Sequence, residues 1–155
     1  MKRIKIIILL SFVLLSNSLF ATVQRRDIFI MSGDTMSVYR SFPLEQYFEQ
    51  KGERTIGGVQ MQFISTAVRR GYIATWKLEN DSLFLTHIYT GHHNVCIKDE
   101  FASDRVFAEW VNEPIIVISQ VVHRRWRSFY VQKHFAFENG RLKDVRIARA
   151  RVRRR

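Results

Sequence analysis

Hydrophobic and polar residues alternate along most of the chain with the period of two that is typical of β-strands. The clearest example is a pair of segments, residues 71–78 and 83–89, separated by Glu79-Asn80-Asp81-Ser82. Asn and Asp tolerate positive φ angles, so Asn80 and Asp81 predict a two-residue hairpin turn between antiparallel strands. Apolar residues occupy part of both faces, and we therefore expect this hairpin to lie in the middle of a sheet.

The turn also fixes the register of this first hairpin, because each residue before the turn faces one residue after it. The predicted pairs are Leu78 with Leu83, Trp76 with Leu85, Ala74 with His87, and Tyr72 with Tyr89. One face of the hairpin is then aromatic and apolar, and His87 lies on that face together with Trp76. We interpret this face as part of the hydrophobic core, in which His87 would be a hydrogen-bonded core residue.

Three more segments have the pattern of strands, namely residues 106–111, 115–122 and 126–137. Glu138-Asn139-Gly140-Arg141 is a second strong hairpin turn. The pairs that it predicts are Glu138 with Arg141 and Phe137 with Leu142. Beyond these pairs, Val145 and Ile147 occupy the other parity, which indicates a bulge or an early end to the pairing.

One short segment has helical spacing instead. Pro43 stands where a helix begins, and Gly52 stands where one ends. Between them, Leu44, Tyr47 and Phe48 recur at helical intervals. The whole pattern predicts a mainly β fold, a single antiparallel sheet domain of about five to eight strands with one short helix near residues 43–50. A meander, a small barrel and a sandwich all fit it.

Length and composition narrow the function classes. With 155 residues the chain has room for one domain, which excludes a two-domain enzyme with a separate cofactor domain. Hydrophobic residues make up 46% of the sequence, a proportion typical of a globular and not of a disordered protein. Cys96 is the single cysteine, so disulfide bonds within the chain do not hold the domain together.

The N-terminal residues 1–21 have the pattern of a secretory signal peptide. Basic residues at positions 2, 3 and 5 precede an apolar run over residues 6–15, and Ala21 offers a small residue for cleavage. The apolar run is about half the ~20 residues that a membrane-spanning helix needs, so cleavage is favoured over an uncleaved anchor. We expect the mature protein to be exported, to a bacterial periplasm or outside the cell.

The positive charge is concentrated near the C-terminus. The chain carries a formal net charge of +11, of which residues 1–21 contribute +3 and residues 141–155 contribute +7. Only +1 is left for residues 22–140, so the body is nearly neutral. We therefore divide the chain into a signal peptide (1–21), a β-rich domain (22–145) and an Arg-rich C-terminal tail (146–155).

In this tail, Arg149, Arg151 and Arg153 alternate with Ala and Val. In a strand they would share one face and guard an exposed sheet edge with charge. In a loose terminus they would attract a membrane surface or another anionic envelope component by Coulomb attraction. A nearly neutral body does not favour nucleic acid as a partner, because nucleic-acid-binding domains spread Lys and Arg over a structured surface.

Two segments resemble a group of small exported bacterial proteins. Arg70-Gly-Tyr-Ile-Ala-Thr-Trp-Lys-Leu-Glu-Asn-Asp-Ser-Leu-Phe-Leu85 is similar to their RGYxATWxIxNxxLYL hairpin, and Val106-Phe-Ala-Glu-Trp110 is similar to a later FADW-like strand. The resemblance spans about a third of the mature chain, and it departs from the pattern at Leu78, Phe84 and Glu109. It supports the hairpin and implies no activity, because no function is established for these proteins.

The residues between His87 and Glu100 include the side chains that ligate transition metals. His87, His92 and His93 are the candidate ligands, and Cys96, Asp99 and Glu100 follow them. Their spacing matches no standard zinc pattern, and histidines of an ordinary loop explain it as well. A small hydrolase or metal-binding protein centred on this region is the alternative function.

A candidate binding cluster lies at His123-Arg-Arg-Trp-Arg127. In a continuous strand, Arg124 and Trp126 would share one face while Arg125 and Arg127 share the other. A cation beside an aromatic ring suits anionic sugars or lipids. The binding residues that we single out are Arg124, Trp126, Arg149, Arg151 and Arg153.

No catalytic motif stands out, because the sequence has no phosphate-cradling Gly loop, no GxSxG and no HExxH. We therefore expect an exported β-rich binding protein without catalytic residues or cofactors. Its partner would be a protein or an anionic component of the cell envelope. An inhibitor or immunity-type module belongs to this class, although no residue selects it.

Overall fold

The computed structural model describes residues 23–124 and 127–151, with the side chains of residues 23–119 and 129–149. The predicted signal peptide, Trp126 and Arg153 lie outside the described residues. The fold is mainly β, as predicted. In chain order the elements are β1 (Ile28–Met31), β2 (Asp34–Val38), α2 (Pro43–Lys51), β3 (Thr55–Ile56), β4 (Val59–Gln60), β5 (Ile73–Glu79), β6 (Ser82–Tyr89), β7 (Asn94–Val95), α3 (Lys98–Phe101), β8 (Val106–Phe107), β9 (Ile115–Arg124), β10 (Arg127–Glu138) and β11 (Arg141–Arg151).

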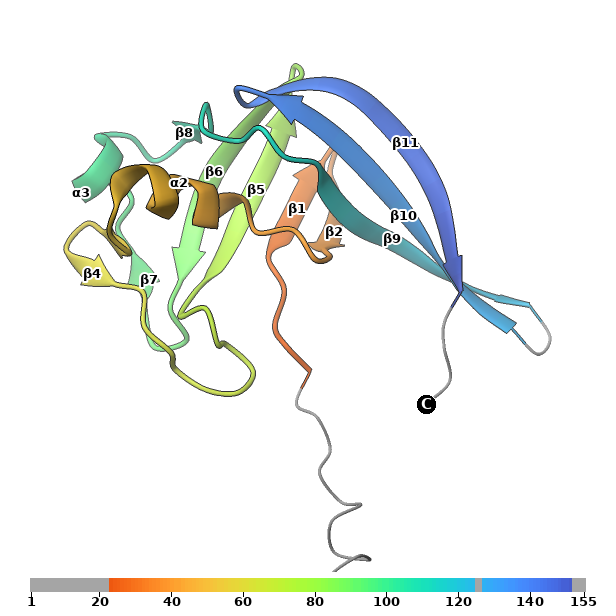
Figure 1. Cartoon of the computed structure of the whole chain (residues 1–155), viewed down its shortest axis with the longest axis horizontal. Coiled ribbons are helices and arrows are strands. Elements are labelled where there is room, and N and C mark those ends of the chain that lie inside the picture. The colour runs from red at the N-terminus through yellow and green to blue at the C-terminus, as the bar shows by residue number, and fades with distance from the viewer. Residues whose placement is uncertain (1–22, 125–126, 152–155) are drawn as a thin grey trace, which may run out of the picture.

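In the described ranges, one sheet has nine strands, of which seven follow the order β11-β10-β9-β2-β1-β5-β6 and close into a ring because β11 returns to β6 (Figure 1). The short strands β7 and β8 also pair with β6. The closing contact pairs Arg141 with Ser82, and the Leu83 N–H beside it donates a hydrogen bond to the Gly140 carbonyl at 2.9 Å. The result is a small barrel, one of the three predicted architectures. Neighbouring strands are antiparallel, except that β1 pairs with β5 in parallel.

The predicted helix is confirmed as α2. Pro43 stands in its first turn, and Gly52 ends it with a left-handed φ of 79° while its N–H donates to the Phe48 carbonyl at 2.9 Å. Leu44 and Phe48 are buried against the barrel, and the Trp110 indole N–H donates to the Pro43 carbonyl at 3.1 Å. These contacts hold the helix over one end of the barrel (Figure 1).

The barrel interior is filled by alternate side chains of its strands. Phe29, Trp76, Leu85 and Val117 are fully buried there. The rings of Phe29 and Phe135 stack across the interior with their centroids 5.0 Å apart. The interior is therefore a packed hydrophobic core and not a channel.

The first hairpin is confirmed in its turn and in half of its register. Asn80 and Asp81 both have positive φ angles, and Leu78 pairs with Leu83 and Trp76 with Leu85 as predicted. The predicted pairs of Ala74 with His87 and of Tyr72 with Tyr89 are wrong, because a bulge lies between Thr75 and Trp76. Beyond it, the pairs are Thr75 with His87, Ala74 with Ile88 and Ile73 with Tyr89.

The bulge has a physical reason in the composition of β6. It changes the parity of the strand, so that Ile88 is fully buried and His87 is exposed. With an unbroken ladder, the core would receive an imidazole and lose an isoleucine. The interpretation of His87 as a core residue is therefore wrong.

The second hairpin is confirmed, including its bulge. Glu138 pairs with Arg141 and Phe137 with Leu142, and the register then shifts so that Ala136 faces Asp144. Strand β11 continues through Arg151, so residues 146–151 pair with β10 as a strand. The strand alternative for this part of the Arg-rich segment therefore describes the structure.

The predicted strand over residues 106–111 is wrong beyond its first two residues. Only Val106 and Phe107 form β8, which pairs with β6. The chain then turns, with the Val111 N–H donating to the Ala108 carbonyl at 3.0 Å, and Trp110 and Val111 are buried. The alternation of apolar residues there reflects a buried turn that directs Trp110 toward α2.

A matched pair of glycine substitutions tests the closure of the barrel. Gly33 and Gly140 are both the second residue of a two-residue hairpin turn, with φ angles of 86° and 71°. A Cβ atom on Gly140 would lie 2.5 Å from the Ala108 carbonyl oxygen, whereas one on Gly33 would meet nothing within 4 Å. We expect Gly33→Ala to lower the free energy of unfolding by about 1 kcal/mol, and Gly140→Ala by about 3 kcal/mol because overpacking is added to the same backbone strain.

Urea denaturation of the two variants at one temperature measures this difference. Equal losses of stability would show that the approach of Gly140 to Ala108 does not constrain the closure.

Candidate interaction surface

A buried carboxylate organises the first of two polar networks in the body. Asp27 is 1% exposed and accepts hydrogen bonds from the Arg70 guanidinium at 2.9 Å, the Ala74 N–H at 3.3 Å and the Trp76 indole N–H at 3.2 Å. Burial raises the pKa of Asp27 above its usual 3.8, and the positive charge of Arg70 partly opposes this shift. The three donors come from the segment that carries the RGYxATW resemblance, so in this chain those residues join β5 to the residue preceding β1.

The same segment is also tied to the helix. The Tyr72 hydroxyl donates to Glu45 of α2 at 2.9 Å, and Arg54 makes an ion pair with the same carboxylate. Arg54 in addition donates to the Arg70 carbonyl at 3.0 Å. Each charged group of this network therefore has a partner within the protein, which is the arrangement of a structural brace.

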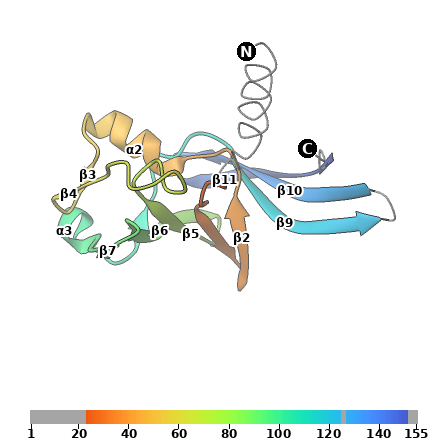
Figure 2. The ribbon, with the colours of Figure 1, turned by 90° about the horizontal axis from the view of Figure 1, so that it is seen from below.

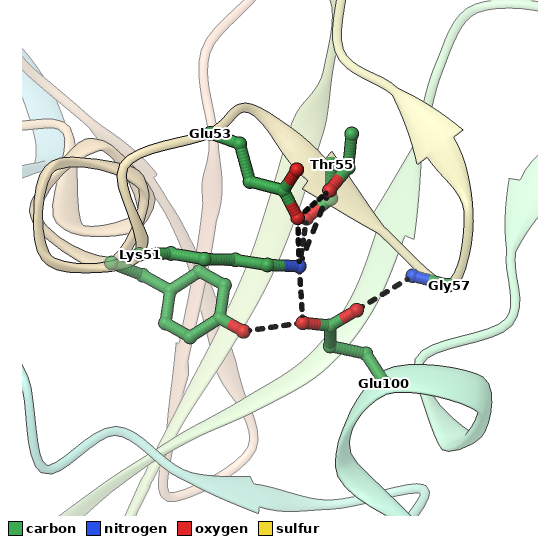
Figure 3. A network of polar contacts seen from close by, with 6 residues as sticks. Lys51, Glu53, Thr55, Gly57 and Glu100 are labelled. Carbon is green, nitrogen blue, oxygen red and sulfur yellow. Dashed lines mark hydrogen bonds and ion pairs between the residues drawn. The ribbon is translucent and has the colours of Figure 1, made fainter.

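A second network joins α2 to α3, and Figure 3 shows it from close by. Glu100 accepts hydrogen bonds from the Tyr47 hydroxyl at 2.6 Å, from the Lys51 ammonium and from the Gly57 N–H at 3.1 Å. Burial and the hydrogen bond to Glu100 raise the pKa of Tyr47 to about 12. Burial acts to raise the pKa of Glu100, but its three hydrogen bonds outweigh that effect and hold it below 4.5.

The structure separates the candidate metal ligands. His87 is exposed and its Nε2 lies 2.9 Å from the Asn94 side-chain oxygen. His92 and His93 border an open hollow of about 290 Å³ next to Phe63. The exposed Cys96 thiol lies 3.4 Å from an Asp99 carboxylate oxygen. Among the residues that the structure describes, no group of three or more His, Cys, Asp or Glu side chains is placed to hold a metal ion.

The most open part of the body is an overhang of three strands. Strand β9 pairs with β2 only at Val117 and Ile118, and β11 pairs with β6 only at Arg141. Beyond these contacts, β9, β10 and β11 continue side by side, away from α2 and α3 (Figures 1 and 2). We call this overhang, formed by residues 119–124, 127–134 and 145–151, the arm.

One face of the arm is the continuation of the barrel interior. Phe135 is in the core, and the next residues of β10 on the same face are Lys133 and Val131. Their partners on β11 are Val145 opposite Phe135, Ile147 opposite Lys133 and Arg149 opposite Val131. Val145 is 43% exposed and Ile147 is 69% exposed, so this face is apolar without being covered. We call the side chains of Lys133, Val145, Ile147 and Arg149 the arm face.

The arm is also the most basic part of the described chain. Its residues 119–124, 127–134 and 145–151 contain six Lys or Arg residues and no acidic residue. Asp144, which directly precedes the arm on β11, is paired with the exposed Arg146 at 2.7 Å. An apolar patch within an excess of positive charge attracts a partner that is negatively charged and partly apolar.

Three of the predicted binding residues, Arg124, Arg149 and Arg151, belong to this arm. Arg149 belongs to the arm face, and Arg151 is on the same side of β11 by register, opposite Phe129. The continuous strand expected through His123–Arg127 is wrong, because Arg124 of β9 and Arg127 of β10 are antiparallel partners. This pairing makes the apolar segments on either side neighbours in one sheet.

Sequence reasoning missed Lys133, Val145 and Ile147 as parts of the surface. The change of parity after the second turn was recognised, but where the core ends along β10 and β11 was not. The signal is present in β10. Phe137 and Phe135 are buried, and Lys133 lies two residues before Phe135 on the same face of the strand. A lysine at the next inward position marks the point at which the strand leaves the core.

Comparisons with family models, with curated proteins and with solved structures find no match for this chain. Among the described residues, no helix combines the length and the apolar character needed to cross a membrane.

The two carboxylates at the centres of the networks predict opposite effects of pH on stability. Glu100 has a lowered pKa, so its contribution is full above pH 4.5 and is lost as the pH falls through its folded-state pKa. We expect Glu100→Gln to cost about 2 kcal/mol at pH 7, because hydrogen bonds to a charged group are lost, and progressively less in acid.

For Asp27 the sign is reversed. Its raised pKa means that its contribution is full below pH 3.8 and is lost as the pH rises through the folded-state pKa. The destabilisation by Asp27→Asn should therefore grow as the pH falls from 7 toward 3.8. Urea denaturation of both variants and of the unchanged protein across this range measures the two slopes. Slopes of the same sign would contradict the assignment of at least one carboxylate.

Proposed function

We propose that the chain is an exported, non-catalytic binding protein that contacts its partner through the arm face. The observation that carries this proposal is the exposure of Ile147, whose side chain is 69% exposed. It lies between Lys133 and Arg149 on a three-stranded ribbon of fixed register. Exposed apolar side chains surrounded by charge are typical of interaction sites. The ribbon holds them in place before the partner arrives, so little ordering entropy opposes binding.

The remaining polar clusters support this proposal over a hydrolase. Asp27 and Glu100 are the most enclosed carboxylates of the two networks, and each accepts three hydrogen bonds from the protein itself. A general acid or base must reach a substrate, and a carboxylate whose partners are all internal is placed to stabilise the fold. The export rests on the sequence of residues 1–21 and places the partner in the periplasm or outside the cell.

Capture of the partner by arm-face variants tests the proposal. The mature chain, residues 22–155, is immobilised and exposed to an extract of the cell envelope, and each bound protein is identified and then purified for direct titration. The double variant Val145→Thr, Ile147→Thr keeps β-branched side chains and removes apolar surface. We expect it to weaken the affinity for the purified partner at least tenfold.

Two controls make the result specific. Phe63 is 62% exposed but lies outside the arm, so Phe63→Thr should leave the affinity unchanged. Deletion of residues 152–155 separates binding by the arm face from attraction to the basic end of the chain. Equal losses in the Phe63 variant and the arm variant, or complete loss on that deletion alone, would refute the proposed surface.

Export has a test of its own. Expressed with its N-terminus intact in a Gram-negative host, the protein should be recovered from the periplasm with Thr22 as its first residue. Ile8→Arg places a charge in the apolar run and should leave the protein in the cytoplasm with Met1 retained. Ser11→Ala, which keeps the run apolar, is the control and should be exported normally. Recovery of the unchanged protein with Met1 from the cytoplasm would contradict export.

A further inference from the structure

The outer edge of the arm is open along β11. On one side, β11 is paired with β10 from Arg141 to Arg151. On the other side, its contact with β6 ends at Arg141 and the adjoining backbone bond at Leu142. In the ranges that the structure describes, the main chain of residues 143–149 has no second strand beside it. Such an edge presents a row of N–H and C=O groups to any extended chain that can approach it.

From residue 144 onward, this edge is protected by charge alone. Soluble proteins usually protect an open edge with proline, with a bulge or with a covering loop. Here the bulge lies at the start of the open segment, and residues 144–151 contain no proline. Arg146 and Arg149 therefore decide which strand can approach. A second copy of the chain would bring the same positive charge and be repelled, whereas an acidic strand would be attracted.

The side chains along the edge define the chemistry of the approaching strand. Val145, Ile147 and Arg149 lie on one face of β11, and Arg146 and Ala148 lie on the other. In an added strand, the residues opposite them would come within about 5 Å between Cβ atoms. An apolar residue of the added strand is therefore favoured opposite Ile147, and carboxylates are favoured opposite Arg146 and Arg149. Arg146 donates to Asp144 through Nε, which leaves guanidinium donors for a second carboxylate.

We propose that residues 143–149 bind the partner by strand addition, and that the partner supplies an extended acidic segment with apolar residues opposite Val145 and Ile147 and carboxylates opposite Arg146 and Arg149. This inference rests on the proposed function and makes it more specific. Main-chain hydrogen bonds to β11 provide much of the affinity, and the arginines select the sign of the partner's charge. The exposed Ile147 provides the apolar contact that the extended segment covers.

The probe for this proposal is a nine-residue peptide that, in antiparallel register with β11, places valine opposite Val145 and Ile147, glutamate opposite Arg146 and Arg149, and threonine elsewhere. The mature protein is titrated with the labelled peptide, and amide hydrogen exchange is followed along β11. We expect the peptide to bind and to slow the exchange of the free edge amides in residues 143–149 at least tenfold. Raising the salt from 50 to 500 mM should weaken binding, because the attraction between the peptide and the arm is screened.

Two altered peptides and two protein variants complete the design. The same peptide with methylated backbone nitrogens cannot form the ladder and should bind at least tenfold more weakly, and the same peptide with lysine in place of each glutamate should not bind. The double variant Arg146→Gln, Arg149→Gln should weaken binding at least tenfold. Arg69→Gln, an exposed arginine outside the arm, is the matched control and should bind normally.

Several outcomes would overturn strand addition. These are a methylated peptide that binds as tightly as the parent, an acidic peptide that does not bind, a concentration-dependent dimer of the protein alone, and preferential binding to phosphatidylglycerol vesicles. The proposed function is judged separately. The double variant Val145→Thr, Ile147→Thr can still lose affinity for a captured partner even when the acidic peptide does not bind the unchanged protein. In that case the partner binds the arm face and not the edge.

Discussion

The unequal length of the barrel strands is the constraint on which the rest of the structure depends. Strands β1, β2, β5 and β6 have 4, 5, 7 and 8 residues, whereas β9, β10 and β11 have 10, 12 and 11. The long strands can be part of a closed barrel only over the length at which the shorter strands lie beside them. A surplus of four or five residues at a rise of about 3.3 Å each leaves roughly 15 Å of the long strands without neighbours among the shorter strands. The arm, its exposed face and its open edge all follow from this difference in length.

The overhang is useful as a binding surface only if the barrel beneath it is rigid. The two polar networks provide this rigidity at the places where the hydrophobic core alone would not. Asp27 fixes the one parallel contact of the barrel, between β1 and β5, by accepting bonds from the backbone and side chains of the β5 segment. Glu100 ties α3 to α2, and Glu45 ties α2 to Tyr72, the residue directly before β5. The long strands therefore extend from a body whose parts cannot slide relative to one another.

Turn chemistry made much of this fold predictable from the sequence. Asn80-Asp81 and Asn139-Gly140 fixed two hairpins, and Pro43 and Gly52 fixed the helix, because each needs only a local backbone preference. What failed depended on contacts distant in sequence. The bulge between Thr75 and Trp76 exists because Ile88 is better buried than His87, and β8 ends early because Trp110 reaches the Pro43 carbonyl. Neither alternative can be chosen before the neighbouring elements are known.

The candidate surface was predictable only in part, for the same reason. Alternation placed Arg149 and Arg151 on one face of a strand, but the height of the barrel wall decides whether that face is core or solvent. Val145 and Ile147 would be ordinary core residues if β1 and β2 were as long as β10. Because these strands are short, the apolar side chains on the inner face of the long strands are exposed to solvent beyond the end of the barrel. Arginine at its outer positions keeps the extension from pairing with copies of itself, since like charges directly opposite each other are unfavourable. The unequal strand lengths expose the edge of β11, and the positive charge of this strand opposes self-association at that edge. The edge is thereby left open to a partner of opposite charge.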